Sequence, residues 1–288
     1  MGKNPAFNLG MLALYALLGF FALLTLIPFV YLLCAALKTQ EAFFSSHFLP
    51  TGDGFAGIAW SGLTLGNFAK LFTDPNIRFG RSLLNSVFFA SITATLSTVF
   101  AAMGGYALAK FEFRLNKLIT TLVVLCLVVP PSLLIAAAFK LIYHLGMLDS
   151  YTGLVLPALA PAYGVFLFRQ AMLRSVPMEL IDAARMDGCG EIGIFFNIVA
   201  PLIRPMIGTF MMISFLQAWN NFISPQIILQ SPEKFPLAVS IAQLKDIYST
   251  DYGVIMAGTL VAIAPVLCLF LLLQKEFISG LTSGAVKG

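Results

Sequence analysis

Side chains that could do chemistry are scarce in this sequence, and the most informative charged stretch runs from Ser175 to Pro205, where nearly everything around it is apolar. If the stretch is helical, successive residues turn by 100°, so Glu179, Asp182 and Arg185 line up along one stripe. The opposite side would carry four apolar side chains: Leu180, Ile181, Ala183 and Ala184. We interpret this helix as a surface that receives force from a cytosolic partner. The alternative is an ordinary surface loop of a membrane protein.

The ends of this helix carry residue types that start and stop helices. Pro177 suits a first helical position, Glu179 complements the helix dipole in the first turn, and Gly188 can take the positive φ that ends a helix. The helix would be about three turns long. A second helical stretch then runs from Glu191 to Val199 and is ended by Pro201. The sequence therefore predicts a helix, a turn and a helix between two membrane spans.

A second group of polar side chains interrupts an apolar run: Gln217, Trp219, Asn220 and Asn221. Amides donate and accept hydrogen bonds to hydroxyl groups, and an aromatic ring can cover the apolar face of a pyranose. The group is therefore a candidate lining for a sugar path. The alternative is that these residues join helices or cap a broken helix ahead of Pro225, with Trp219 at an interface.

The patterns expected of an enzyme or of an ion-coupled carrier are missing. No acid or base lies in the middle of a long apolar run, where ion-coupled carriers usually place them. The two histidines, His47 and His144, fall in predicted external loops. The phosphate-binding pattern G-x-x-x-x-G-K-[ST] is absent, so ATP-driven work would enter through another polypeptide. We predict no catalytic residue, no cofactor and no metal site in this chain, and inert thiols at the four cysteines, Cys34, Cys126, Cys189 and Cys268.

Composition and run lengths predict an all-α membrane protein. The chain is 59% hydrophobic and 10% charged, far from the average of soluble domains. A spanning helix needs about 20 mostly apolar residues, and six stretches between charged residues approach or exceed that length. We predict one transmembrane domain over residues 1–288 with six spans. They are expected at roughly 9–37, 82–109, 118–139, 150–168, 205–228 and 252–274.

The distribution of lysine and arginine predicts how these spans are oriented. The loop between spans two and three holds Lys110, Arg114 and Lys117, and the loop 169–204 holds four arginines. The short loops on the other side carry fewer basic residues, and cytoplasmic loops are the ones enriched in them. We expect the loop 169–204 and both termini in the cytoplasm. The long loop 38–80 is expected in the periplasm, where it either braces a partner or merely connects two spans.

The spacing within the loop 169–204 resembles the cytoplasmic signature loop of ABC importer permeases, E-A-A-x3-G-x9-I-x-L-P. Asp182 stands in place of the glutamate and Ala200 in place of the leucine. The fuller run P-x-E-L-x-x-A-A-x-x-D-G, which starts at Pro177, is similar to the carbohydrate-importer branch. The segment 280–288 is similar to the C-terminus of the maltose-type second permease subunit. The other matching residues are Ala183-Ala184, Gly188, Ile198 and Pro201 in the loop, Leu37-Lys38-Thr39 after the first span, and Trp219-Asn220.

This resemblance implies a type I ABC importer permease of the cytoplasmic (inner) membrane that translocates a sugar or sugar-like solute. The implied partners are a second homologous permease, two ATPase subunits holding ATP and Mg, an extracytoplasmic solute-binding protein and membrane lipid, with no nucleic acid. The helix from Pro177 to Asp187 would sit in a cleft of one ATPase, whose closure would tilt the spans. The residues implied in this contact are Glu179, Leu180, Asp182, Ala183, Ala184, Arg185, Asp187 and Gly188.

Two other functions stay open on the sequence. A self-sufficient channel or facilitator would conduct solute without ATP, and a scaffold subunit would have no translocation path at all. The sequence does not separate a sugar from a sugar phosphate or a polyol. It also leaves open whether this subunit touches the solute.

Overall fold

The computed structural model describes residues 9–245 and 251–285, so the last three residues of the C-terminal similarity, 286–288, lie outside it. The described residues form helices and no β-strand, which confirms the predicted all-α class. Two isolated bridges pair Lys38 with Leu63 and Thr51 with Ile58. The chain divides into two compact units: Met1–Phe79 with Ile241–Ile263, and Gly80–Ser240 with Ala264–Gly288.

The first unit contains α1 (Leu9–Ala36), α2 (Gln40–Ser45), α3 (Gly66–Thr73) and residues 252–263 of α15 (Tyr252–Ala285). α1 leaves most of its large apolar side chains exposed, as expected of a helix that lies in lipid. The loop 38–80 holds α2, α3 and two 3₁₀ turns, η1 (Phe55–Gly57) and η2 (Trp60–Gly62). It is therefore more ordered than a plain connector.

Lys38, which follows α1, is central to the polar contacts of this unit. Its side chain is 1% exposed, and its ammonium group donates to the carbonyl oxygens of Ser46 at 2.7 Å and His47 at 3.1 Å. These carbonyls lie at the end of α2, where backbone acceptors lack helical partners. The Asn67 amide of α3 donates to the backbone oxygens of Ala36 and Lys38, each at 2.8 Å. Lys38 and Asn67 thereby join the ends of α1, α2 and α3.

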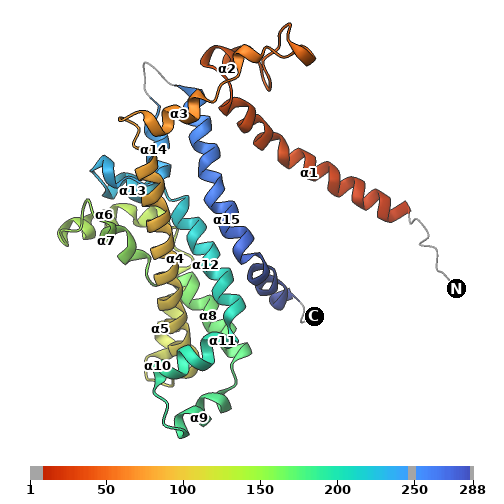
Figure 1. Ribbon diagram of the computed structural model, residues 1–288. Helices are drawn as coiled ribbons and strands as arrows, with labels where there is room; N and C mark the ends of the chain where they lie inside the picture. The colour runs from red at the N-terminus through yellow and green to blue at the C-terminus, as the bar shows by residue number, and fades with distance from the viewer. Residues whose placement is uncertain (1–8, 246–250, 286–288) are drawn as a thin grey trace, which may run out of the picture. The chain divides into compact units, whose positions relative to one another are not determined.

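The second unit is built on α4 (Phe79–Lys110), all of which except its first residue belongs to it. Within this unit α4 runs from the region of α13 to the region of α5 and α10 (Figure 1). The other helices are α5 (Asn116–Cys126), α6 (Ile135–His144), α7 (Tyr151–Val155), α8 (Ala162–Ser175), α9 (Met178–Met186), α10 (Glu191–Ile194), α11 (Ala200–Leu202), α12 (Arg204–Trp219), α13 (Ile223–Ile228), the first part of α14 (Leu237–Gln243) and residues 264–285 of α15. The short turns are η3 (Pro131–Leu134), η4 (Leu156–Ala158), the π-helical η5 (Phe195–Val199) and η6 (Pro232–Lys234).

Glycines allow α4, α8 and α12 to approach closely. A Cβ atom on Gly105 of α4 would lie 2.7 Å from the backbone nitrogen of Arg169 and from Cβ of Phe168 in α8. A Cβ atom on Gly164 of α8 would lie 2.4 Å from the ring of Phe210 in α12. The rings of Phe168 and Phe210 pack edge to face at 5.2 Å. This contact forms the middle of the core in the second unit, because both side chains are fully buried.

Within residues 9–245 and 251–285, four helices are long and apolar enough to cross a membrane: Gly10–Ala36, Phe79–Lys110, Tyr151–Ser175 and Tyr252–Leu272. Two further pairs of helices are sharply bent. The first bend, 100° between Asn116–Cys126 and Pro131–His144, falls at Pro130 and Pro131, which cannot donate to a helix and force the preceding residue into an extended form. The second, 88°, separates Glu191–Leu202 from α12. Six spans, if each bent pair is one, stay a prediction.

Candidate functional site

The predicted helix in the loop 169–204 is α9, and its C-terminal end is closed as the sequence indicates, since Gly188 has a φ of +80°. Pro177, expected at the first helical position, lies one residue before the helix as its N-cap. The backbone nitrogen of Gly188 donates to Arg185 O and that of Cys189 donates to Ala184 O, both at 3.0 Å. This pair of hydrogen bonds is a Schellman motif, in which a glycine in the left-handed region ends the helix. The chain then turns into α10.

The apolar side of α9 divides into a buried edge and an exposed edge. Ile181 is 0% exposed and Ala184 is buried, whereas Leu180 is 45% exposed and Met186 is 89% exposed. Ala183 is also exposed. The buried edge belongs to the same apolar core as span residues of α4, α8 and α12: Tyr106, Leu108, Phe168, Met172 and Phe210. The chain itself therefore covers Ile181 and Ala184, and leaves Leu180, Ala183 and Met186 free for a partner.

Arg185, one of the residues expected to contact a partner, also bonds within the chain. Its Nε donates to Glu191 Oε1 at 2.8 Å, and its Nη1 donates to Asp182 Oδ1 at 3.1 Å. The guanidinium also lies over the ring of Phe111, 5.6 Å from the centroid. These hydrogen bonds raise the pKa of Arg185 and lower the pKa of Glu191. Glu179 and Asp187 remain exposed on α9.

Glu191 connects α9 and α10 to the end of α4. The hydroxyl group of Tyr106 donates to Glu191 Oε2 at 2.9 Å. The Tyr106 ring packs against Phe111 at 5.4 Å and Phe195 at 5.7 Å. We call Tyr106, Asp182, Arg185 and Glu191 the Glu191 network. Sequence reasoning missed it because Tyr106 and Glu191 are 85 residues apart; the one local signal was a carboxylate at Glu191 six residues after Arg185.

An open groove of about 1050 Å³ lies beside α9 and is positively charged. Two of its cations are fixed to backbone oxygens: Lys110 Nζ donates to Val176 O at 2.6 Å, and Arg169 Nε donates to Leu108 O at 3.3 Å. The charged side chains that line it are Lys110, Arg114, Lys117, Arg169 and Arg185, with Glu112 as the one carboxylate among them. Basic residues from separate loops thus gather at one end of the second unit.

The polar group in the predicted fifth span does not act as one site. Trp219 is buried and stacks on Phe215 at 5.6 Å, and Asn221 Oδ1 accepts from the backbone nitrogen of Ser224 at 3.3 Å, near the start of α13. These two contacts match the helix-joining and helix-capping alternative. Gln217 and Asn220 are exposed. Among the four residues of the sugar-path hypothesis, Gln217 and Asn220 are therefore the ones most accessible to a solute.

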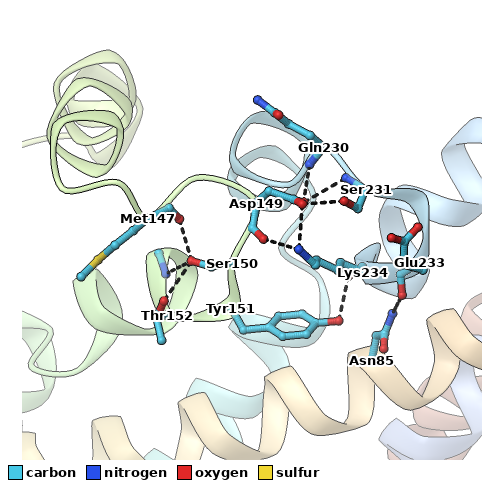
Figure 2. A network of polar contacts seen from close by, with 11 residues as sticks. Asn85, Met147, Asp149, Ser150, Tyr151, Thr152, Gln230, Ser231, Glu233 and Lys234 are labelled. Carbon is cyan, nitrogen blue, oxygen red and sulfur yellow. Dashed lines mark hydrogen bonds and ion pairs between the residues drawn. The ribbon is translucent and has the colours of Figure 1, made fainter.

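A second polar network lies in the same unit around Asp149, and Figure 2 shows it. The Asp149 carboxylate accepts from the backbone nitrogens of Gln230 and Ser231, each at 2.9 Å, from the Ser231 hydroxyl group, and from Lys234 Nζ at 2.7 Å. The Tyr151 hydroxyl group donates to Lys234 O at 2.9 Å. We call these five residues the Asp149 network. In the sequence, Lys234 is one of the few basic residues in the short loops predicted opposite the loop 169–204.

The Asp149 network is joined to α4 by two side chains near the start of that helix. The Asn85 amide donates to Glu233 O at 2.8 Å (Figure 2). It also donates to Phe235 O at 3.1 Å. The Ser86 hydroxyl group accepts from the backbone nitrogen of Leu237 at 2.6 Å. Across residues 9–245 and 251–285, no three His, Cys, Asp or Glu side chains gather as a metal site requires. The arrangement is thus a set of hydrogen-bonded joints and exposed surfaces.

Comparison with known proteins gives this arrangement a context. Residues 97–275 match the family model described as "Binding-protein-dependent transport system inner membrane component". The chain is 38% identical to the arabinooligosaccharides transport system permease protein AraQ of Bacillus subtilis (strain 168), over 99% of each chain. It is 31% identical to the lactose transport system permease protein LacG of Rhizobium radiobacter, over 95% of each chain.

The fold has a solved counterpart. A chain in the crystal structure of a bacterial ABC transporter involved in the import of the acidic polysaccharide alginate matches with a TM-score of 0.77. The match covers 96% of this chain and 99% of that chain, at 22% sequence identity. At this identity the likeness concerns the fold.

Proposed function

Because the chain belongs to the family of binding-protein-dependent transport system inner membrane components, we propose that it is one of two permease subunits of an ATP-driven importer for a sugar or short oligosaccharide. The relatives named for arabinooligosaccharides and lactose support a carbohydrate as the solute. Such a subunit is a multi-pass protein of the inner membrane. An extracytoplasmic solute-binding protein delivers the solute, and a second homologous permease completes the path.

The energy enters through separate ATPase subunits, two per transporter, which hold ATP and Mg. No cofactor is assigned to this chain, which contains no G-x-x-x-x-G-K-[ST] pattern. The observation that carries the docking role is the divided face of α9: Ile181 and Ala184 anchor it internally while Leu180 and Met186 are exposed. Exposed apolar side chains flanked by Glu179, Asp182 and Asp187 fit a partially apolar cleft with a polar rim.

The orientation of the chain in the membrane follows from the charges around α9. The positively charged groove beside α9 supports a cytoplasmic position for the loop 169–204, because cytoplasmic loops are enriched in Lys and Arg. In this orientation both termini are cytoplasmic and the loop 38–80 is periplasmic. Gln217 and Asn220 are the side chains proposed for the solute path.

Leu180→Glu tests the docking role, because it places a charge on the exposed edge and leaves the anchored edge intact. We expect the tagged variant to remain in the membrane, to lose the ATPase subunits that co-purify with the native chain, and to lose uptake. Leu65→Glu is the matched control, since Leu65 is an exposed leucine outside the second unit; it should retain the ATPase subunits. Native ATPase recovery with Leu180→Glu would refute docking on α9, and solute flux through the chain alone without ATP would favour a channel.

A further inference from the structure

The two polar networks of the second unit lie near opposite ends of one continuous helix. Tyr106 of the Glu191 network and Asn85, which bonds the segment next to Lys234, are both in α4. At 1.5 Å per residue, the two positions are separated by about 30 Å, the thickness of a bilayer core. Figure 1 shows α4 as an unbroken helix over this distance. A helix whose backbone hydrogen bonds are all internal moves as a rod.

The Glu191 carboxylate joins this rod to α9 itself, beside the hydrogen bond from Lys110 Nζ of α4 to Val176 O, which lies ahead of α9. Glu191 Oε1 accepts from Arg185 Nε of α9, and Glu191 Oε2 accepts from the Tyr106 hydroxyl group of α4. Phe111 packs against both donors, under the guanidinium and beside the tyrosine ring. A displacement of α9 along the membrane surface would therefore pull on the end of α4 through two directional hydrogen bonds.

The apolar core under α9 fixes the direction in which α9 pulls on α4 less well than these two hydrogen bonds do. Ile181 and Ala184 hold α9 by hydrophobic contact, which is non-directional. The side chains of Arg185 and Glu191 are 32% and 40% exposed, and partly exposed ion pairs contribute little to stability. Removing the Glu191 carboxylate should thus leave the fold intact while loosening the joint.

We propose that Glu191 is the positioning residue that transmits movement of α9 to α4, and that α4 carries this movement to the segment bonded by Asn85. The inference rests on the proposed function, because it requires an ATPase that moves α9. It assigns Tyr106 and Arg185 as the two arms of the joint.

The test uses the complete transporter in proteoliposomes with its solute-binding protein, and measures solute imported per ATP hydrolysed. Glu191→Ala is expected to retain bound ATPase and hydrolysis while this ratio falls at least fivefold. Tyr106→Phe, which removes one hydroxyl group, is expected to lower it about twofold. Glu191→Gln should recover most of the ratio, because its amide can accept from Arg185 and donate to the Tyr106 oxygen. Glu112→Gln, an exposed carboxylate on the neighbouring loop, is the control and should match the native chain.

A double-variant cycle tests the role of α4. The free-energy effects of substitutions this far apart usually add. If the two joints are independent, the fold-loss in solute imported per ATP for the double variant Asn85→Ala/Glu191→Ala should equal the product of the two single fold-losses. Transmission along α4 predicts a double variant no worse than the poorer single one. A native ratio in Glu191→Ala, an equal fall in Glu112→Gln, or multiplied losses would overturn the inference. Loss of bound ATPase in Glu191→Ala would also overturn it, whereas failure of the docking role itself would appear in Leu180→Glu.

Discussion

The two networks of the second unit use a carboxylate in different ways. Asp149 accepts from two backbone nitrogens, a hydroxyl group and a lysine, so it fixes the path of the segment that follows α13. In the part of the chain that the structure describes, the Glu191 carboxylate accepts from two side chains, which belong to different helices. Backbone donors cannot change rotamer, whereas a tyrosine and an arginine can. The comparison indicates a rigid joint at Asp149 and an adjustable joint at Glu191.

The largest effect is expected when the rigid joint is removed. Asp149→Ala leaves the three donors of Gln230 and Ser231 without their acceptor, while Lys234 Nζ keeps the backbone oxygen of residue 149. It also places an alanine at a φ of +53°, where a side chain is strained. We expect the thermal midpoint of the purified chain to fall by several degrees and its yield from membranes to drop. Asp149→Asn tolerates the positive φ and keeps one acceptor oxygen, so its thermal midpoint should lie between those of Asp149→Ala and the native chain. An unchanged midpoint in Asp149→Ala would contradict the rigid joint.

A smaller effect is expected from a substitution in the apolar core that packs under α9, next to the adjustable joint. Ile181→Ala removes a fully buried side chain under α9 and should cost about 2–5 kcal/mol of local stability, because a cavity is left. Limited proteolysis should then cut the loop 169–204 faster. Leu180→Ala is the matched control, since Leu180 is exposed on the same helix, and its cleavage rate should stay close to native. Equal rates in both variants would show that α9 is held by Glu191 alone.

The smallest effect is expected from pH. The hydrogen bond from Lys234 holds the pKa of Asp149 well below its usual range, and Arg185 lowers the pKa of Glu191. Folded-state pKa values that are depressed stabilise the fold above the unfolded values, about 3.9 and 4.3, and this stabilisation is lost as pH falls through the folded values. Between about pH 5 and 8 neither carboxylate should alter the thermal midpoint. A thermal midpoint that rises as the pH is lowered within this range would contradict the expected direction of the pH effect.

Local signals predicted much of the site. Pro177, Glu179 and Gly188 mark the ends of α9 because caps act within one turn of the chain. The long apolar runs of α1, α4 and α15 predicted spans for the same reason, since length and hydrophobicity are local properties. Pro225 indicated a break between α12 and α13. The sequence did not show whether Asn221 caps the helix after this break or contacts a sugar.

The joints could not be predicted. Asp149 and Lys234 are 85 residues apart, as are Tyr106 and Glu191, and nothing in either segment specifies its partner. Periodicity places Arg185 on a polar stripe, but it does not tell that the guanidinium turns inward to Glu191 and Phe111. The close approach of α4 and α8 at Gly105 likewise exists only once the fold is formed.

The turn after α9 separates how the helix ends from what the helix presents. Its two closing hydrogen bonds come from the backbone at Gly188 and Cys189, so the turn does not depend on the exposed side chains of Leu180 and Met186. Substitutions at these two positions can therefore change the surface offered to a partner while the end of the helix stays in place.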